Sequence, residues 1–352
     1  MFPRPIPGMA LEGRLEEGLV RVGGDARQRY HDARGYGYPL SGDEIALSPV
    51  EAAHLLFRGD LAAVVADGDR LDFRGFAARE PGTEFGLRFL VYADLRSRGF
   101  YLAPAAEPWL ADPPDADFAV FPRGKGPGDG EVAYALRIVG ERTDVPAATL
   151  RPGTLAIVDE ESEITYLSVE RADPEGTTVY ELPTAVEADL LSDRVVLWEP
   201  PPELYERGFF GQPLEGREYE EPTLQCSLVE AAHLAAAGAI DLAVTAACER
   251  GRAVEGERFD RRLRVYAELR ERGVVPKTGY KFGADFRTYA HVESVDALGH
   301  SELLVRVLPT DHVFEPRDLA LDVRLAHGVR KRMVFALVGE GIEWLAVERL
   351  TP

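Results

Sequence analysis

The sequence of 352 residues contains two copies of one long unit, and this duplication limits the folds open to the chain. Residues 48–55 (SPVEAAHL) return as 227–234 (SLVEAAHL), and residues 91–99 (VYADLRSRG) return as 265–273 (VYAELRERG). The two matches are offset by 179 and 174 positions, so a small insertion or deletion separates them. A spacing of about 175 residues is far longer than the period of a solenoid repeat. The pattern therefore predicts a tandem duplication of a domain-sized unit.

A third match ties the beginnings of the two copies together. Residues 35–40 (GYGYPL) correspond to 209–214 (FFGQPL). Beyond these segments, Ser48 and Ser227 each precede a Ser-x-x-Glu pattern and an apolar run. Such a pattern is a capping box, in which serine and glutamate satisfy the first free amides of a helix. A helix is expected to begin at each serine.

The later part of each copy mixes helical and strand patterns. Amphipathic helices are expected over 87–99 and 260–273, each ended by an Arg-Gly pair in which glycine takes the left-handed conformation. Alternation with a period of two residues, and apolar residues spaced by four, predict the remaining elements of the second copy. These are strands at 282–289, 300–308, 332–338 and 343–348, and a helix at 318–329 that carries Leu321, Leu325 and Val329.

The expected fold class is α+β. Each copy contains a small N-terminal α/β subdomain followed by a C-terminal subdomain with a mixed sheet. The boundaries follow from the repeat offsets and from the Pro- and Glu-rich junction near 175–183. The four expected subdomains are residues 1–80, 81–174, 183–257 and 258–352.

Composition limits the compartment and the environment. No run of 18 or more apolar residues occurs and the N-terminus has no apolar leader, so neither a membrane span nor a secretory signal is expected. We expect a cytoplasmic protein. Acidic residues outnumber Lys and Arg by 60 to 40, and only four of the cations are lysines, which is typical of a halophile. Because the Debye length is about 3 Å in molar salt, the net charge of −20 does not exclude nucleic acid as a partner.

The segment 277–332 concentrates reactive side chains. It holds three of the four lysines of the chain and contains Tyr289, His300 and Lys331. Together these side chains can cleave a phosphodiester when the 2′-hydroxyl of RNA is the nucleophile: a base removes its proton, an acid protonates the leaving 5′-oxygen, and a cation stabilises the phosphorane. Histidine suits the acid, whereas tyrosine, with a pKa of about 10, needs a nearby cation to act as base. Each residue alone is more often structural.

The first copy lacks this set. When residues 118–121 are aligned with 286–289, Phe121 stands opposite Tyr289, and no histidine stands opposite His300. The segment that corresponds to Arg330-Lys331 has no basic pair either. The pattern predicts one competent copy supported by one degenerate copy.

The order GYKFGADFRxY, GHSxxLV and RLAxxVRK within this segment closely resembles the catalytic domain of the archaeal tRNA-intron splicing endonucleases. The resemblance is dense over the last 75 residues or so, and the family includes a duplicated form with a degenerate first copy. It implies a nuclease-like fold for the C-terminal subdomains and a lyase-type cleavage of precursor tRNA at bulge-helix-bulge junctions. That cleavage leaves a 2′,3′-cyclic phosphate and a 5′-hydroxyl, with no metal or other cofactor. It implies that Tyr289 is the general base, His300 the general acid and Lys331 the stabilising cation.

The resemblance also implies contacts outside the triad. In the family, two arginines from different subunits stack on a bulged base; Arg324 matches the motif, and Arg349 matches only by its place near the C-terminus. The duplicated form is a homodimer in which an acidic loop of one subunit enters a basic groove of the other. The loop at 140–146 is the candidate here, with Glu141 and Asp144 facing Arg330 or Arg332 across subunits.

Two other functions stay open from the sequence. A non-catalytic RNA-binding or assembly subunit of a splicing complex would keep the fold, and a ribonuclease of broader specificity would keep the triad. The retained triad argues against the first. Metal chemistry is disfavoured because the pairs at 291–293 and 312–315 lack a third ligand at a sensible spacing.

Overall fold

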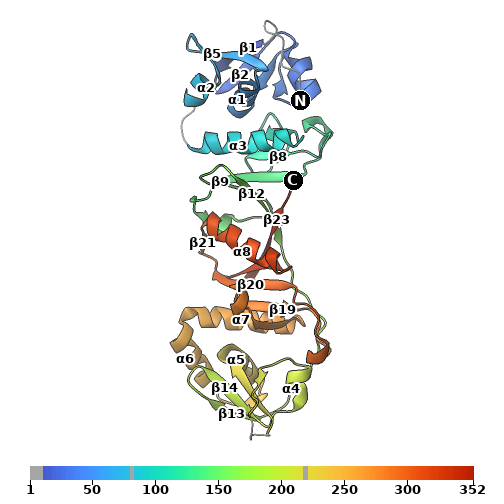
Figure 1. Cartoon of the computed structure of the whole chain (residues 1–352), viewed down its shortest axis with the longest axis vertical. Helices are drawn as coiled ribbons and strands as arrows, with labels where there is room; N and C mark the ends of the chain where they lie inside the picture. The colour runs from blue at the N-terminus through green and yellow to red at the C-terminus, as the bar shows by residue number, and fades with distance from the viewer. Residues whose placement is uncertain (1–10, 80–82, 217–220) are drawn as a thin grey trace.

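The computed structural model of the chain describes residues 11–79, 83–216 and 221–352, so the boundary expected at 80/81 lies outside the described residues. The molecule is elongated: a small α/β subdomain occupies each end of the long axis and a large sheet lies between them (Figure 1). The fold is α+β, as predicted. Among the helices of the described ranges, none has the length and apolar character that a membrane span needs.

The two end subdomains are built in the same way, with helices packed on a small sheet. The first has strand order β3-β4-β2-β1-β5-β6 and the second β15-β16-β14-β13-β17. The elements of the first are β1 (Leu11–Glu16), β2 (Leu19–Val22), β3 (Tyr38–Pro39), β4 (Ile45–Leu47), β5 (Leu61–Ala66), β6 (Asp69–Leu71), α1 (Pro49–Arg58) and α2 (Phe73–Arg79). Those of the second are β13 (Val186–Leu190), β14 (Arg194–Trp198), β15 (Gln212–Pro213), β16 (Thr223–Ser227), β17 (Ile240–Asp241), α4 (Pro202–Glu206), α5 (Leu228–Ala236) and α6 (Val244–Glu255).

The central sheet has ten strands in the order β18-β19-β20-β22-β23-β12-β11-β9-β8-β7. The first copy supplies β7 (Leu102–Pro104), β8 (Phe118–Val120), β9 (Tyr134–Gly140), β11 (Gly153–Val158) and β12 (Ile164–Arg171), with α3 (Thr83–Ser97). The second supplies β18 (Val275–Thr278), β19 (Phe286–Tyr289), β20 (Leu303–Pro309), β22 (Arg332–Val338) and β23 (Ile342–Leu350), with α7 (Glu257–Glu271) and α8 (Pro316–Gly328). A separate two-stranded sheet joins β10 (Val145–Pro146) to β21 (Val313–Phe314).

The last strand of each copy forms the joint between the copies. β12 and β23 pair antiparallel from Tyr166↔Leu350 to Arg171↔Leu345. One hydrophobic core lies against this joint and draws Leu167 from the first copy and Phe335 from the second. Because apolar side chains from both copies bury one another there, the two copies fold as one body.

Most of the elements expected in the second copy are present, and one is shorter. Residues 282–289 do not form a single strand: Tyr280–Phe282 is a 3-10 turn, Gly283 has φ +70°, and the strand begins only at Phe286. Gly283 ends the turn in a left-handed conformation that does not fit a strand. Residues 282–285 therefore show the alternating pattern without forming a strand.

The apolar residues spaced by four on α8 do not face the core. Leu321, Leu325 and Val329 are exposed, whereas Leu319 and Val323 face the sheet. The helix itself was predicted correctly, but the side on which it packs was decided by the neighbouring strands. An exposed apolar stripe of this kind is a candidate contact surface.

Both predicted capping boxes are present, and their glutamates are buried in different charge environments. Burial raises the pKa of the Glu51 carboxyl, although hydrogen bonds from Gly37 and Ser48 oppose this effect. Burial also raises the pKa of Glu230, but the Lys277 ammonium, 2.7 Å from its Oε1, acts with the Ser227 amide and Arg270 to lower that pKa to about 2.

This ion pair joins the second end subdomain to the central sheet. Lys277 lies on β18, and its Nζ also donates to the carbonyl of Gly211, 3.0 Å away. The folded pKa of Glu230 lies below its ordinary value of 4.5. The pair therefore stabilises the protein above about pH 4.5, and that stabilisation falls as the pH drops towards 2.

Replacing the lysine tests the pair. We expect Lys277→Met to lower the free energy of unfolding by about 3–5 kcal/mol at neutral pH, because it leaves a buried carboxylate without its cation. The double variant Lys277→Met/Glu230→Gln should recover most of that loss. Urea unfolding in concentrated salt measures both, with Lys125→Met, a change at an exposed lysine, as the control. An equally large loss in the double variant would contradict the interpretation.

Candidate active site

Three strand ends bring the predicted triad to one edge of the central sheet. Tyr289 is the last residue of β19. His300 lies three positions before β20, and Lys331 directly precedes β22. β19 runs antiparallel to β20, with Thr288 opposite Leu303, and β20 runs parallel to β22, with Leu303 opposite Arg332. The end of one strand and the beginnings of two others therefore meet at this edge, although the residues are up to 42 positions apart.

Lys331 is fixed beside the histidine segment. Its Nζ donates to the carbonyl of Ser301, 2.6 Å away, and Ser301 directly follows His300. Burial lowers the pKa of the Lys331 ammonium, the Arg287 guanidinium lowers it further, and Glu302 acts in the opposite direction. The Lys331 ammonium and the Arg287 guanidinium are therefore close enough to affect one another electrostatically.

Tyr289 is nearly buried, with 8% of its surface exposed. Its ring belongs to a small apolar cluster with Phe209, Val275 and Val292 that is separate from the main cores. The Arg287 guanidinium lies 5.9 Å from the ring centroid. A cation on the same side of the strand as the tyrosine is placed to stabilise negative charge that develops at this edge.

His300 lies in the segment between the 3-10 turn at Val295–Ala297 and β20, and its side chain is exposed. The backbone around it is held from two sides. The amide of Arg332 donates to the carbonyl of Glu302, and the amide of Ala290 donates to the Glu302 carboxylate at 3.1 Å. The imidazole is therefore open to a large ligand while its segment is anchored to both neighbouring strands.

The two predicted base-stacking arginines lie outside this edge group. Arg324 is exposed on α8, and Arg349 is exposed on β23 opposite Leu167 of the first copy. Arg349 is on the same side of β23 as Val347, which is the side that α8 covers. Both guanidinium groups therefore belong to the α8 side of the molecule, and no contact in the described residues joins them to the triad.

The same strand position in the first copy has a structural role. Phe121 follows β8 as Tyr289 ends β19, and its amide donates to Tyr101 just as Tyr289 pairs with Val275. Phe121 is fully buried and packs on Ala103 and Ala119. The alignment that placed Phe121 opposite Tyr289 is confirmed.

Four neighbours of the triad were missed by sequence reasoning. Arg287 had a readable signal, since a residue two positions before Tyr289 lies on the same face of a strand. Ser301 and Glu302 stood within the quoted motif, but their partners depend on strand register. Phe209 lies 80 positions from Tyr289 and in another subdomain, so no local pattern pointed to it.

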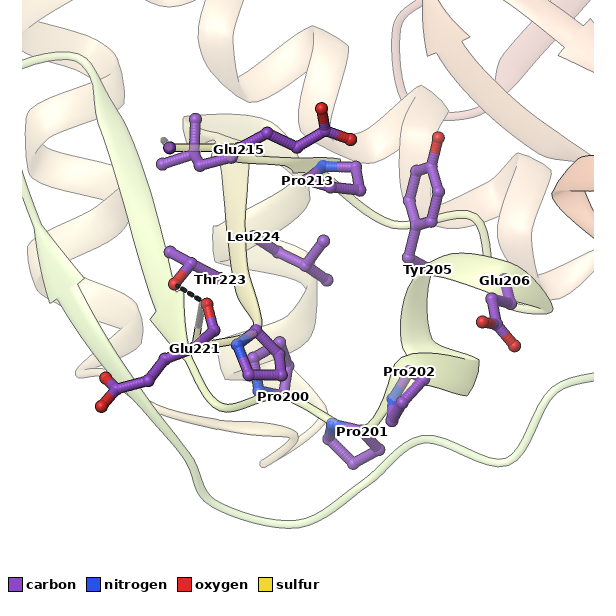
Figure 2. A pocket seen from close by; sticks show the side chains of 13 residues that line it. Pro200, Pro201, Pro202, Tyr205, Glu206, Pro213, Glu215, Glu221, Thr223 and Leu224 are labelled. Atoms are coloured by element: carbon purple, nitrogen blue, oxygen red, sulfur yellow. Dashed lines mark hydrogen bonds between the residues drawn. The ribbon is translucent and has the colours of Figure 1, made fainter. Parts of the chain in front are cut away.

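A separate hollow of about 490 Å³ lies beside α4, away from the triad. Figure 2 shows that it is lined by prolines, by Tyr205 and by acidic side chains. Glu206, Glu215 and Glu221 give it a negative lining, which is unsuited to the phosphates of RNA. Within the described ranges, no three His, Cys, Asp or Glu side chains gather in a group that would hold a metal ion.

Comparison with known proteins agrees with the repeated architecture. A family model for the catalytic C-terminal domain of tRNA intron endonucleases matches residues 259–344, and the model for their N-terminal domain matches both 11–77 and 186–249. The chain is 58% identical over 349 residues to a tRNA-splicing endonuclease of Halobacterium salinarum, covering 97% of this chain and 100% of that protein.

Further relatives carry the same name. A tRNA-splicing endonuclease of Haloferax volcanii is 56% identical over 346 residues, covering 97% of this chain and 100% of the relative. One from Methanosarcina acetivorans is 35% identical over 367 aligned positions, covering 97% and 99%. The halophilic sources agree with the acidic, lysine-poor composition. With both domain models matched and relatives of high identity covered over nearly the whole chain, the chain belongs to the tRNA intron endonuclease family.

Proposed function

We propose that this chain excises introns from precursor tRNA by cutting at bulge-helix-bulge junctions, without a metal ion. The main support is that the strand ends that carry Tyr289, His300 and Lys331 meet at one edge of the sheet in the second copy. At the position equivalent to Tyr289, the first copy has a buried phenylalanine. This supports a catalytic chain over a non-catalytic RNA-binding subunit. Action in the cytoplasm stays a prediction.

The proposed reaction uses the RNA as its own nucleophile. The phenolate form of Tyr289 accepts the 2′-proton. The 2′-oxygen then attacks phosphorus, and the bond from phosphorus to the 5′-oxygen breaks. His300, exposed at the edge, donates a proton to the leaving 5′-oxygen. Lys331 and Arg287 stabilise the charge of the phosphorane. The products are a 2′,3′-cyclic phosphate and a 5′-hydroxyl, and solvent restores the two protonation states.

We further propose that the active form is a homodimer. The stripe of Leu321, Leu325 and Val329 on α8 exposes apolar surface that a second copy would cover. Part of the expected acidic-loop contact is already used within the chain, since Arg332 pairs with Glu170 and Glu348. The exposed Arg330 and Asp144 are then the pair through which loop 140–146 would reach a partner subunit.

Cleavage of an intron-containing precursor tRNA in molar salt and EDTA tests the chemistry. We expect full activity in EDTA and a rate about 10²–10⁴-fold lower in His300→Ala, because a positioned general acid contributes that range. RNA affinity should be unchanged. His327→Ala, at another exposed histidine, is the control. Cleavage that needs an added divalent metal, or an equal loss in affinity, would overturn the mechanism.

The arginine proposal predicts weaker binding of the bulged RNA. Arg324→Ala and Arg349→Ala should each raise the dissociation constant by about 5–150-fold, which corresponds to about 1–3 kcal/mol of base stacking. The lysine variants should not restore affinity, because an ammonium lacks the planar face. Arg317→Ala, at another exposed arginine of α8, controls for charge alone. A similar loss in all three alanine variants would point to general electrostatic attraction.

The dimer proposal predicts a change of mass in solution. Leu321→Glu/Leu325→Glu should convert a dimer into monomers in light scattering, because two carboxylates would be buried at the contact. Leu191→Glu changes an equally exposed leucine in the second end subdomain, directly after β13, and should remain dimeric. A double variant that stays dimeric would exclude the α8 stripe as the contact, and a monomeric wild-type chain would exclude the dimer.

A further inference from the structure

Phe209 occupies a turn position whose left-handed backbone conformation is unfavourable for a residue with a β-carbon. Its φ is +50°, in the left-handed region, where a residue with a β-carbon is destabilised by about 1–2 kcal/mol. The equivalent residue of the first copy is Gly35, which has φ +62° without that penalty. The same turn is therefore built with glycine in one copy and with a buried phenylalanine in the other. Retained strain of this kind clusters at functional sites.

The strained residue contacts the proposed catalytic base. The rings of Phe209 and Tyr289 lie edge to face, with centroids 5.6 Å apart and an interplanar angle of 63°. Tyr205 also packs against Phe209, with ring centroids 5.9 Å apart. Leu298, two residues before His300, packs against the same cluster. The end subdomain thus supplies one wall of the compartment that holds the Tyr289 ring.

Cations hold the Phe209 loop in place. The Lys277 Nζ lies 4.9 Å from the centroid of the Phe209 ring while it bonds Gly211 and Glu230. Arg270 donates to the carbonyl of Gly208, 2.7 Å away. The position of Phe209 is therefore set by ion pairing within the second copy and not by apolar packing alone.

The two copies differ at three positions around the Tyr289 ring. Where the second copy has Phe209, Lys277 and Tyr289, the first has Gly35, Ala103 and Phe121 at the equivalent strand and turn positions. The arginine that anchors the loop is common to both, since Arg96 donates to the carbonyl of Arg34 at 2.8 Å. The anchor therefore belongs to the shared fold, whereas the aromatic wall and its lysine accompany the triad.

We propose that Phe209 is a positioning residue for Tyr289, supplied to the active site by the N-terminal subdomain of the second copy. This inference rests on the proposed role of Tyr289 as general base. The phenylalanine ring limits the orientations of the tyrosine ring and so keeps its hydroxyl at the sheet edge beside His300 and Lys331. A displacement of about 1 Å in a reacting group can lower a rate by about 100-fold. Correct placement of the Tyr289 ring therefore offsets the backbone strain at Phe209.

A double-mutant cycle on single-turnover cleavage tests this proposal. Phe209→Gly installs the residue of the first copy, which removes the ring and relieves the backbone strain. We expect a rate at saturating enzyme at least about tenfold lower, with the RNA dissociation constant changed by less than about twofold. In a Tyr289→Phe background, the same substitution should change the residual rate by less than about twofold, because the hydroxyl that Phe209 orients is gone.

Phe210→Ala is the matched control. Phe210 is the next residue and equally buried, but its ring packs under Arg270 in the core of the end subdomain. We expect Phe210→Ala to lower the melting temperature more than Phe209→Gly and to lower the rate less. Equal rate losses from Phe209→Gly in both Tyr289 backgrounds would overturn the positioning role and leave the triad intact. A Tyr289→Phe variant with the wild-type rate would instead overturn the role of Tyr289 itself, and the positioning role with it.

Discussion

The antiparallel pairing of β12 with β23 is the interaction on which the rest of the molecule depends. Each is the last strand of its copy, and alone each would present an open edge of backbone donors and acceptors. Their pairing removes both edges and makes ten strands continuous. The core beneath it is shared, with Leu167 and Leu345 packed in the same cluster. The first copy therefore completes the sheet of the second.

The two end subdomains are joined to the central sheet in different ways. Both end subdomains lie far from it, and each is tied to its own half of the sheet. In the first copy Arg96 donates to the carbonyl of Arg34 and lies over the Tyr36 ring, and the position equivalent to Lys277 is Ala103. In the second copy the tie carries a buried ion pair, Lys277–Glu230, and a strained phenylalanine next to Tyr289. The same scaffold thus carries two kinds of junction between subdomain and sheet.

Local patterns were reliable where the forces are local. The capping boxes at Ser48 and Ser227 formed as predicted because the serine and glutamate meet within one helical turn. Period-two alternation failed at 282–285, where a left-handed Gly283 and a 3-10 turn replace the strand. The apolar spacing in α8 predicted the helix correctly but did not show which side is buried, because its apolar residues spaced by four face outward.

The candidate site also depends partly on local patterns and partly on contacts between distant segments. Motif order picked out Tyr289, His300 and Lys331, and the comparison of the copies separated them from the scaffold. Their meeting at one edge depends on the register of β19, β20 and β22, which no single segment specifies. The scarcity of lysine drew attention to Lys277, but its partner Glu230 lies 47 positions away in another subdomain.

By itself, then, the sequence determined the duplication, the α+β class and the helix starts, and it predicted the triad, because each of these depends on contiguous residues or on repeated segments. Only the tertiary structure decided which strands close the sheet, which side of α8 is buried, and that Phe209 borders Tyr289. Those outcomes follow from packing and ion pairing between distant segments, whose energies depend on three-dimensional register and not on local spacing.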